Sequence, residues 1–323
     1  SAMSAKTSQG VTSVVVGNCG VSMAPLTLSG PPVPPMDLLG TREQYAYPTF
    51  ADYLATLRSA GTAVNAACLC GHTTLRAGAM DDLTRPATAS EIEVMRGHLD
   101  EAMRSGAIGF STGLAYPPAM PAPREEVESL AEVCARYGGI HTTHIRDESE
   151  NMMDALDEAF QIGRSASMPV LVSHFKCSGT ANYGKSAERL AHFDRAAAKQ
   201  DLSVDAYPYA ASSTILNPDF IAEAERVMIT WSVPHPDMRG RDLADISSEW
   251  GVEQGEAAER LQPAGAVYFA MDENDVRRIL QHTDTMIGSD GLPHDSHPHP
   301  RLWGTFPRVL GHYARDVDLF PMG

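Results

Sequence analysis

The sequence GIHTTHIRDESENMMDALDEAFQIGRSASMPVLVSH, residues 139–174, contains two short apolar runs with a helical pattern between them. The runs GIHTT and PVLVS are followed directly by His144 and His174. The intervening stretch at 152–164 has the apolar spacing of a helix that covers a sheet. A strand, a crossing helix and a second strand predict two neighbouring parallel strands, which indicates an α/β fold.

The same alternation extends along the whole chain. Apolar runs rich in β-branched residues recur with helical patterns between them, which favours a closed barrel or a doubly wound parallel sheet. A helix at 91–104 is predicted to have Ser90 as its N-cap and to end at Gly106. The predicted strands are 11–16, 64–69, 107–110, 139–143, 169–173, 202–206 and 285–289.

One segment interrupts this alternation. Residues 220–263 separate two predicted parts of the barrel by an unusually long stretch. This stretch includes two tryptophans and several prolines, so we predict an inserted subdomain or lid there. Residues 4–219 and 264–323 then form the barrel, and residues 1–3 are a tag-like remnant. A length of 323 residues suits one β/α barrel with an insertion.

Composition excludes several kinds of partner. A formal net charge of -16 would repel a nucleic-acid backbone, and no basic cluster offsets it. No apolar run approaches the roughly 20 residues that a membrane span needs, so no membrane partner is expected. The five cysteines are scattered and odd in number, which predicts free thiols and a reducing, cytoplasmic location.

Chemically active residues follow the predicted strands. In a β/α barrel the active site forms at the carboxyl ends of the strands. Cys19 follows the first strand, and His144 and His174 follow two neighbouring ones, about 5 Å apart in a sheet. Two imidazoles and a thiolate predict a tetrahedral zinc site. Alone, each residue is commonly structural, a buried histidine or a small apolar cysteine.

Asp290 follows the last predicted strand. Alone it could form an Asx turn or a helix cap, but opposite a metal it suits a general acid and base. Lys176, just past a strand, could form a Schiff base as in aldolases. The two neighbouring imidazoles and the cysteine fit a metal better.

Longer motifs surround these residues, namely GVTSVVVGNCGVSMAPL, GHTTLR, GAIGFSTGLAYPP, HTTHIRDE, SHFKCSG, DAYPYAASST and MIGSDGLPHDSHPHPRLWGTFPRVLGHYAR. These motifs are distributed along nearly the whole chain, from residue 10 to residue 315. They resemble the D-aminoacylases, which are N-acyl-D-amino-acid deacylases of the amidohydrolase superfamily. The resemblance implies a TIM-type β/α barrel of the metal-dependent hydrolase type.

The resemblance also implies an activity, the hydrolysis of N-acyl-D-amino acids to a D-amino acid and a carboxylate. We expect one tightly bound zinc ion, and His72 could hydrogen-bond the site from its own strand end. By position in the motifs, the implied residues are Cys19, His144 and His174 for zinc, Asp290 as acid and base, and Lys176, Tyr207, Ser213 and Arg301 for the substrate carboxylate.

The chain departs from the family pattern. Nothing upstream of Cys19 supplies the family's His-x-His pair for a second metal, and the His-x-His at 297–299 lies after the last strand. The first strand, the last helix and the small β-rich domain of the family are also missing. We therefore expect an incomplete barrel that self-associates through its open edge. The alternatives are a cyclic-amide hydrolase resembling dihydroorotases or hydantoinases, or an inactive, truncated metal-binding barrel.

Overall fold

The computed structural model describes residues 3–292 and 295–321, so the first two residues of the predicted tag lie outside it. The chain divides into two compact units, which are described separately. The first consists of Ser1–Phe175 and Ala191–Asp205, and the second of Lys176–Leu190 and Ala206–Gly323.

A parallel sheet forms the centre of the first unit. Its strands pair in the order β1-β4-β5-β6-β7-β8, and every pairing is parallel. The predicted succession of parallel strands joined by helices is therefore confirmed. The strands are β1 (Ser13–Val16), β4 (Asn65–Gly71), β5 (Gly109–Gly113), β6 (Ile140–His144), β7 (Val170–Val172) and β8 (Leu202–Ala206).

Strand β5 continues past its predicted end. The prediction stopped at residue 110 because polar side chains follow, yet Ser111 and Thr112 are fully buried. The Thr112 hydroxyl donates to Thr143 Oγ1 on β6 at 2.8 Å, so its polar group is satisfied inside the fold. Gly113 lies opposite His144, which brings the carboxyl ends of β5 and β6 level.

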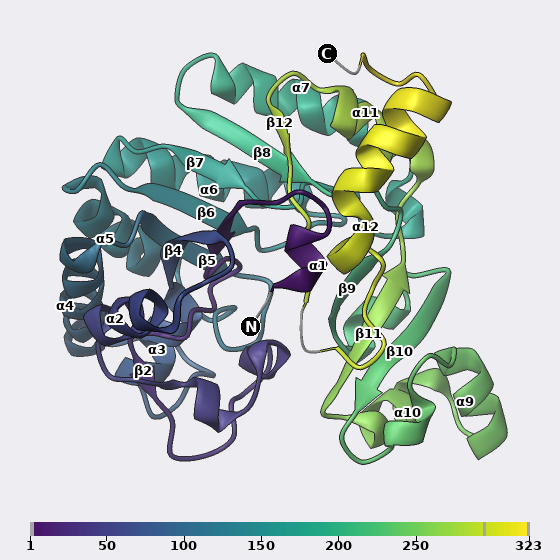
Figure 1. Cartoon of the computed structure of the whole chain (residues 1–323), viewed down its shortest axis with the longest axis horizontal. Coiled ribbons are helices and arrows are strands. Elements are labelled where there is room, and N and C mark those ends of the chain that lie inside the picture. Colours follow the sequence, from purple (N-terminus) through teal and green to yellow (C-terminus); the bar gives the residue numbers. More distant parts are fainter. Residues whose placement is uncertain (1–2, 293–294, 322–323) are drawn as a thin grey trace. The chain divides into compact units, whose positions relative to one another are not determined.

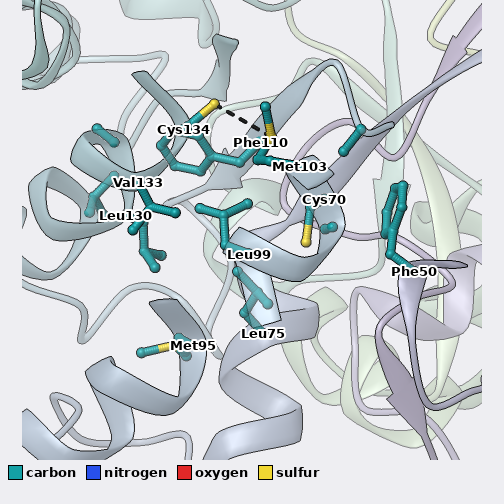
Figure 2. Close-up of a cluster of buried hydrophobic side chains, with 14 of the residues drawn as sticks. Phe50, Cys70, Leu75, Met95, Leu99, Met103, Phe110, Leu130, Val133 and Cys134 are labelled. Atoms are coloured by element: carbon teal, nitrogen blue, oxygen red, sulfur yellow. Dashed lines mark hydrogen bonds between the residues drawn. The ribbon is translucent and has the colours of Figure 1, made fainter. Parts of the chain in front are cut away.

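Helices cover this sheet (Figure 1). Helix α5 (Arg124–Ala135) packs against α4 (Ala89–Ser105) and against α6 (Met152–Ala166). Figure 2 shows Leu99 of α4, Leu130 of α5 and Phe110 of β5 in the buried cluster between them. Burying a side chain such as Phe110 contributes roughly 1.5–3 kcal/mol. The unit also has α1 (Ser4–Thr7), β2 (Leu26–Thr27), η1 (Met36–Leu39), η2 (Arg42–Gln44), β3 (Ala46–Tyr47), α2 (Phe50–Ala60) and α3 (His72–Ala79).

Helix α4 begins at a different cap from the one predicted. Thr88, not Ser90, is the N-cap: its side chain accepts from Glu91 N–H, and Glu91 accepts from the Thr88 N–H. This reciprocal capping box satisfies two N–H groups at the helix end, whereas Ser90 lies inside the first turn. The predicted end at Gly106 is confirmed, with φ of 118°.

The second unit contains an antiparallel sheet in the order β10-β11-β9. The predicted insertion at 220–263 lies within this subdomain, but the strands on either side of it, β9 and β11, belong to the same sheet rather than to the parallel one. The predicted ranges 4–219 and 264–323 placed the residues of β9 and β11 in the barrel, because a sequence pattern does not reveal which strands pair with each other. The subdomain consists of β9 (Ser212–Ile215), α8 (Pro218–Ile221), β10 (Arg226–Ser232), η4 (Pro236–Met238), α9 (Leu243–Trp250), α10 (Gln254–Leu261) and β11 (Ala264–Phe269).

The last predicted strand is β12 (Thr285–Ile287), shorter than the predicted 285–289. The N–H of Gly288 donates to the carbonyl of Ala206, the final residue of β8, at 3.1 Å. Within the described ranges, no helix has the length and apolar character that crossing a membrane requires. The remaining helices are η3 (Thr180–Asn182), α7 (Ser186–Ala197), α11 (Glu273–Gln281), α12 (Arg301–Arg308) and the π-helix η5 (Val309–Asp316).

Candidate metal centre

Cys19 is presented by a tight turn after β1. The turn has left-handed backbone at Gly17, Cys19 and Gly20, with φ of 86°, 51° and 79°. A Cβ at Gly17 would collide with the Leu69 carbonyl, so the turn packs directly on β4. Ser111 Oγ accepts from the Gly20 N–H at 3.0 Å and thereby fixes the turn to β5. The backbone at Cys19 is strained, and its surroundings hold it in place.

Cys19, His144 and His174 are brought together as predicted. One donor atom from each lies within 4.8 Å of the donor atoms of the other two. Cys19 Sγ is 3.2 Å from His174 Nε2, and the two imidazole centroids are 4.5 Å apart. In a tetrahedral zinc site, sulfur and nitrogen ligands are about 3.6 Å apart, so the donor set fits zinc in chemistry and in spacing.

His174 adopts a conformation that the sequence does not reveal. Its φ is 42°, and its backbone N–H donates to Asp205 Oδ1 on β8 at 2.7 Å. The left-handed turn makes His174 leave the line of β7, while the Asp205 carboxylate holds its backbone. The ring is 3% exposed in this position.

Hydrogen bonds between strand ends support this arrangement. Asn18 Oδ1 accepts from the Thr142 hydroxyl at 2.7 Å, and Asn18 Nδ2 donates to Ser173 Oγ at 3.0 Å. These bonds connect the ends of β1, β6 and β7 immediately beside the candidate ligands. The spacing between Cys19 and His174 therefore does not depend on their own contact alone.

Glu148 is a neighbour of the centre to which the sequence assigned no role. Its Oε1 lies 2.8 Å from His174 Nδ1, and its Oε2 lies 3.6 Å from His144 Nε2. The sequence feature that could have pointed to Glu148 is its position four residues after His144, in HTTHIRDE. An acidic residue in a loop is too common for that signal to suffice.

His72 lies in a separate hydrogen-bonded group. Its ring is fully buried, and Nε2 is 2.8 Å from Glu126 Oε1, which also accepts from Arg76 Nη1 at 2.6 Å. Burial lowers the pKa of His72, so the neutral ring donates to the carboxylate. Burial alone would raise the pKa of Glu126, but His72 and Arg76 lower it to about 2.

The second unit gathers Asp290 and the candidate carboxylate-binding residues. Arg301 Nη1 lies 2.7 Å from Asp290 Oδ2, and Nη2 donates to the Ser213 carbonyl at 2.7 Å. The Arg301 guanidinium and the Lys176 ammonium are 4.7 Å and 5.8 Å from the centroid of the Tyr207 ring. The Ser213 hydroxyl is buried, and no atom of the described residues hydrogen-bonds it. All five predicted residues thus form one cluster.

The second histidine of the His-x-His at 297–299 is buried and supports Arg301, a contact that the sequence did not predict. His299 Nδ1 accepts from the Arg301 backbone N–H at 2.9 Å. Burial lowers the pKa of His299 to about 3, so it is neutral at physiological pH. The ring therefore acts as a fixed acceptor that sets the start of α12.

Comparison with known proteins identifies the family of this chain. The family model described as "Amidohydrolase family" matches residues 1–322.

The chain belongs to this family.

The predicted family and barrel type are thereby confirmed. A D-aminoacylase of Alcaligenes xylosoxydans xylosoxydans is 55% identical over 320 residues, which cover 99% of this chain and 66% of that protein. An N-acyl-D-glutamate deacylase of the same organism is 49% identical over 321 residues, 98% of this chain and 65% of that protein. The chain therefore spans just under two thirds of the length of these relatives.

Solved structures agree with the sequence relatives. A D-aminoacylase, described with a binuclear metal center, superposes with a TM-score of 0.97 at 54% identity, over 99% of this chain and 68% of that one. An N-acyl-D-glutamate deacylase from Bordetella bronchiseptica, complexed with zinc and a phosphonate inhibitor, superposes with a TM-score of 0.95 at 46% identity and the same coverage.

Proposed function

We propose that this chain provides the catalytic barrel of a zinc-dependent enzyme that hydrolyses N-acyl-D-amino acids. The observation that supports this most directly is the thiol and two imidazoles of Cys19, His144 and His174, whose donor atoms converge within 4.8 Å. The relatives that act on N-acyl-D-amino acids supply the substrate class.

A metal fits the chemistry that the reaction needs. When bound, zinc would supply a Lewis acid for the acyl carbonyl and lower the pKa of a water towards about 7. Cys19, His144 and His174 would hold one ion. We propose a single tightly bound zinc, because three ligands satisfy a catalytic zinc site that keeps one position open.

Asp290 is the proposed proton carrier. Its carboxylate takes a proton from the attacking water, whose oxygen bonds to the carbonyl carbon. The C–N bond then breaks, and Asp290 returns the proton to the departing amine nitrogen. Since Arg301 holds Asp290 Oδ2 at 2.7 Å, the carboxylate has a fixed orientation before substrate arrives.

The cluster around Tyr207 would bind the substrate carboxylate. A guanidinium, an ammonium and two hydroxyls, from Arg301, Lys176, Tyr207 and Ser213, match the charge and hydrogen-bonding capacity of a carboxylate. The buried Ser213 hydroxyl supports this role, because a buried donor gains most from a polar ligand.

The cyclic-amide alternative requires a lysine that bridges two metals. Lys176 is the lysine that could have done so, but its ammonium lies beside the Tyr207 ring in the second unit. This position favours a role in binding an anion. A cyclic amide without a free carboxylate would leave the cluster without its ligand.

The test is hydrolysis by this chain of N-acetyl-D-amino acids, with zinc content measured on the same samples. We expect turnover that a chelator abolishes and added zinc restores, and Cys19→Ala should lower zinc content and turnover together. Matched substrates are the L-enantiomers, the D-amino acid amides that lack the carboxylate, and a hydantoin. Zinc-loaded protein that leaves every D-substrate intact would favour the inactive barrel.

The state of the cysteines bears on location. The five cysteines form no disulfide with one another, and four of them are buried. Since unoxidised thiols persist in a reducing compartment, we propose a cytoplasmic location. The natural ligand that we propose is a small N-acyl-D-amino acid, the substrate class of the relatives.

A further inference from the structure

We propose that Glu148 is a positioning residue that fixes the tautomer and ring orientation of His174. This inference rests on the metal-binding part of the proposed function and assigns a role to a residue outside the ligand set. Its basis is a carboxylate that contacts the nitrogen of His174 facing away from Cys19.

The His174 ring spans two partners through opposite nitrogens. Nδ1 lies 2.8 Å from Glu148 Oε1, and Nε2 lies 3.2 Å from Cys19 Sγ. A carboxylate accepts only, so Nδ1 carries the proton and Nε2 presents its lone pair toward the thiol. His174 therefore has the tautomer that a metal ligand at Nε2 requires.

The backbone and the ring of His174 are fixed by two different carboxylates. Asp205 accepts from the His174 N–H at 2.7 Å and fixes the backbone, which its φ of 42° turns away from β7. That bond leaves rotation about the side-chain torsions open. Glu148, whose side chain is 15% exposed, supplies the second point of attachment.

The contact of Glu148 with His144 is of another kind. His144 Nε2 and Glu148 Oε2 are 3.6 Å apart, which is too long for a hydrogen bond but close enough for electrostatic attraction. Glu148 thus fixes one imidazole by a hydrogen bond and adds negative charge beside both. Carboxylates that hydrogen-bond ligand histidines raise ligand basicity, and their loss typically weakens metal binding 10–100-fold.

The experiment compares Glu148→Ala and Glu148→Gln with Glu150→Gln, an exposed neighbour in the same loop. Zinc affinity of the metal-free protein is measured by competition with a chelator, and no substrate is present. We expect zinc affinity to fall at least tenfold in Glu148→Ala, less in Glu148→Gln, which keeps an acceptor, and not at all in Glu150→Gln.

The tautomer supplies a readout that a purely structural role would not change. Ring ¹⁵N NMR shifts of His174 should show protonation at Nδ1 in the metal-free parent and a shift toward Nε2 protonation in Glu148→Ala. If that variant fails to fold, Glu148→Gln provides the comparison, since it conserves size. Nε2 protonation in the parent, or zinc affinity in both Glu148 variants within twofold of Glu150→Gln, would overturn the proposal whether or not the chain is a deacylase.

Discussion

Cys19, His174 and Asp290 share a left-handed backbone, with φ of 51°, 42° and 47°. Residues other than glycine adopt this conformation at a cost of about 1–3 kcal/mol, and they do so mainly where the surrounding structure enforces it. All three follow strands and carry a side chain that we propose to bind a metal or to accept a proton. The strain is consistent with side chains that are turned out of the strand direction to reach a site.

Asp290→Asn tests the acid and base assignment. Asparagine has the same shape and tolerates left-handed backbone, but it cannot accept the water's proton, so kcat should fall about 10²–10⁴-fold with zinc content unchanged. Asp318→Asn is the matched control, because Asp318 is exposed and has φ of 54°. Equal kcat values for the two variants would show that Asp290 does not transfer the proton.

Asp37 provides a pH-dependent prediction. Burial raises its pKa to about 6, from 3.8 when unfolded, and Oδ1 has no hydrogen-bond partner among the described residues. A raised folded-state pKa adds stability below about pH 4, and this gain is lost as the pH rises through about 6.

Asp37→Asn should therefore raise the free energy of unfolding by roughly 1–3 kcal/mol at pH 7, since it removes a buried charge. The difference from the parent should vanish near pH 4. Urea unfolding at several pH values measures this difference in the free energy of unfolding. A difference that does not depend on pH would contradict the buried Asp37 charge as its cause.

At the scale of elements, the turns and caps determine where the strands and helices end. The turn at 17–20 packs on β4 and β5 through glycines that no other residue could replace without a collision. In α4 the choice of cap depends on which hydroxyl reaches the Glu91 N–H, and Thr88 does so. The turn and the helix cap each involve residues that are close in sequence. The path of the folded backbone decides which of two neighbouring residues, such as Thr88 and Ser90, becomes the cap.

Thr88→Ala should lower the free energy of unfolding by about 1 kcal/mol, because it removes the side-chain half of the capping box. Ser90→Ala should change it by less than about 0.5 kcal/mol, since Ser90 lies in the first turn, where alanine is a good helix former. Urea denaturation of both variants measures the difference. Equal losses would mean that the helix begins elsewhere in solution.

At the scale of the whole molecule, the chain forms two compact units with different sheets. The first holds the candidate zinc ligands, and the second holds Asp290 and the cluster around Tyr207. Each group is assembled from residues far apart in sequence, as with Cys19 and His174. Loss of either unit would therefore remove one half of the proposed chemistry.

We propose self-association through β1. In the described part of the first unit, β1 pairs only with β4, and Val15 on it is 58% exposed. An unpaired edge offers backbone groups to a second copy. Sedimentation should show a concentration-dependent dimer, and Val15→Lys should weaken it, while Val94→Lys on the exposed face of α4 should not. A monomer at all concentrations would contradict this proposal.

The strand succession and the candidate ligands could be predicted from the sequence, because apolar periodicity and strand-end position are local properties. Cys19, His144, His174 and Asp290 could be named from those properties and from motif resemblance. The sequence did not predict the contacts of Glu148 and His299, since loop residues are placed by their partners.

Tertiary structure alone decided how polar groups are satisfied. It extended β5 through buried Ser111 and Thr112, moved the α4 cap to Thr88, and paired β9 and β11 with β10. It also placed His72 with Glu126 and Arg76. Each result depends on which distant atom completes a hydrogen bond, and that choice is made only when the chain has folded.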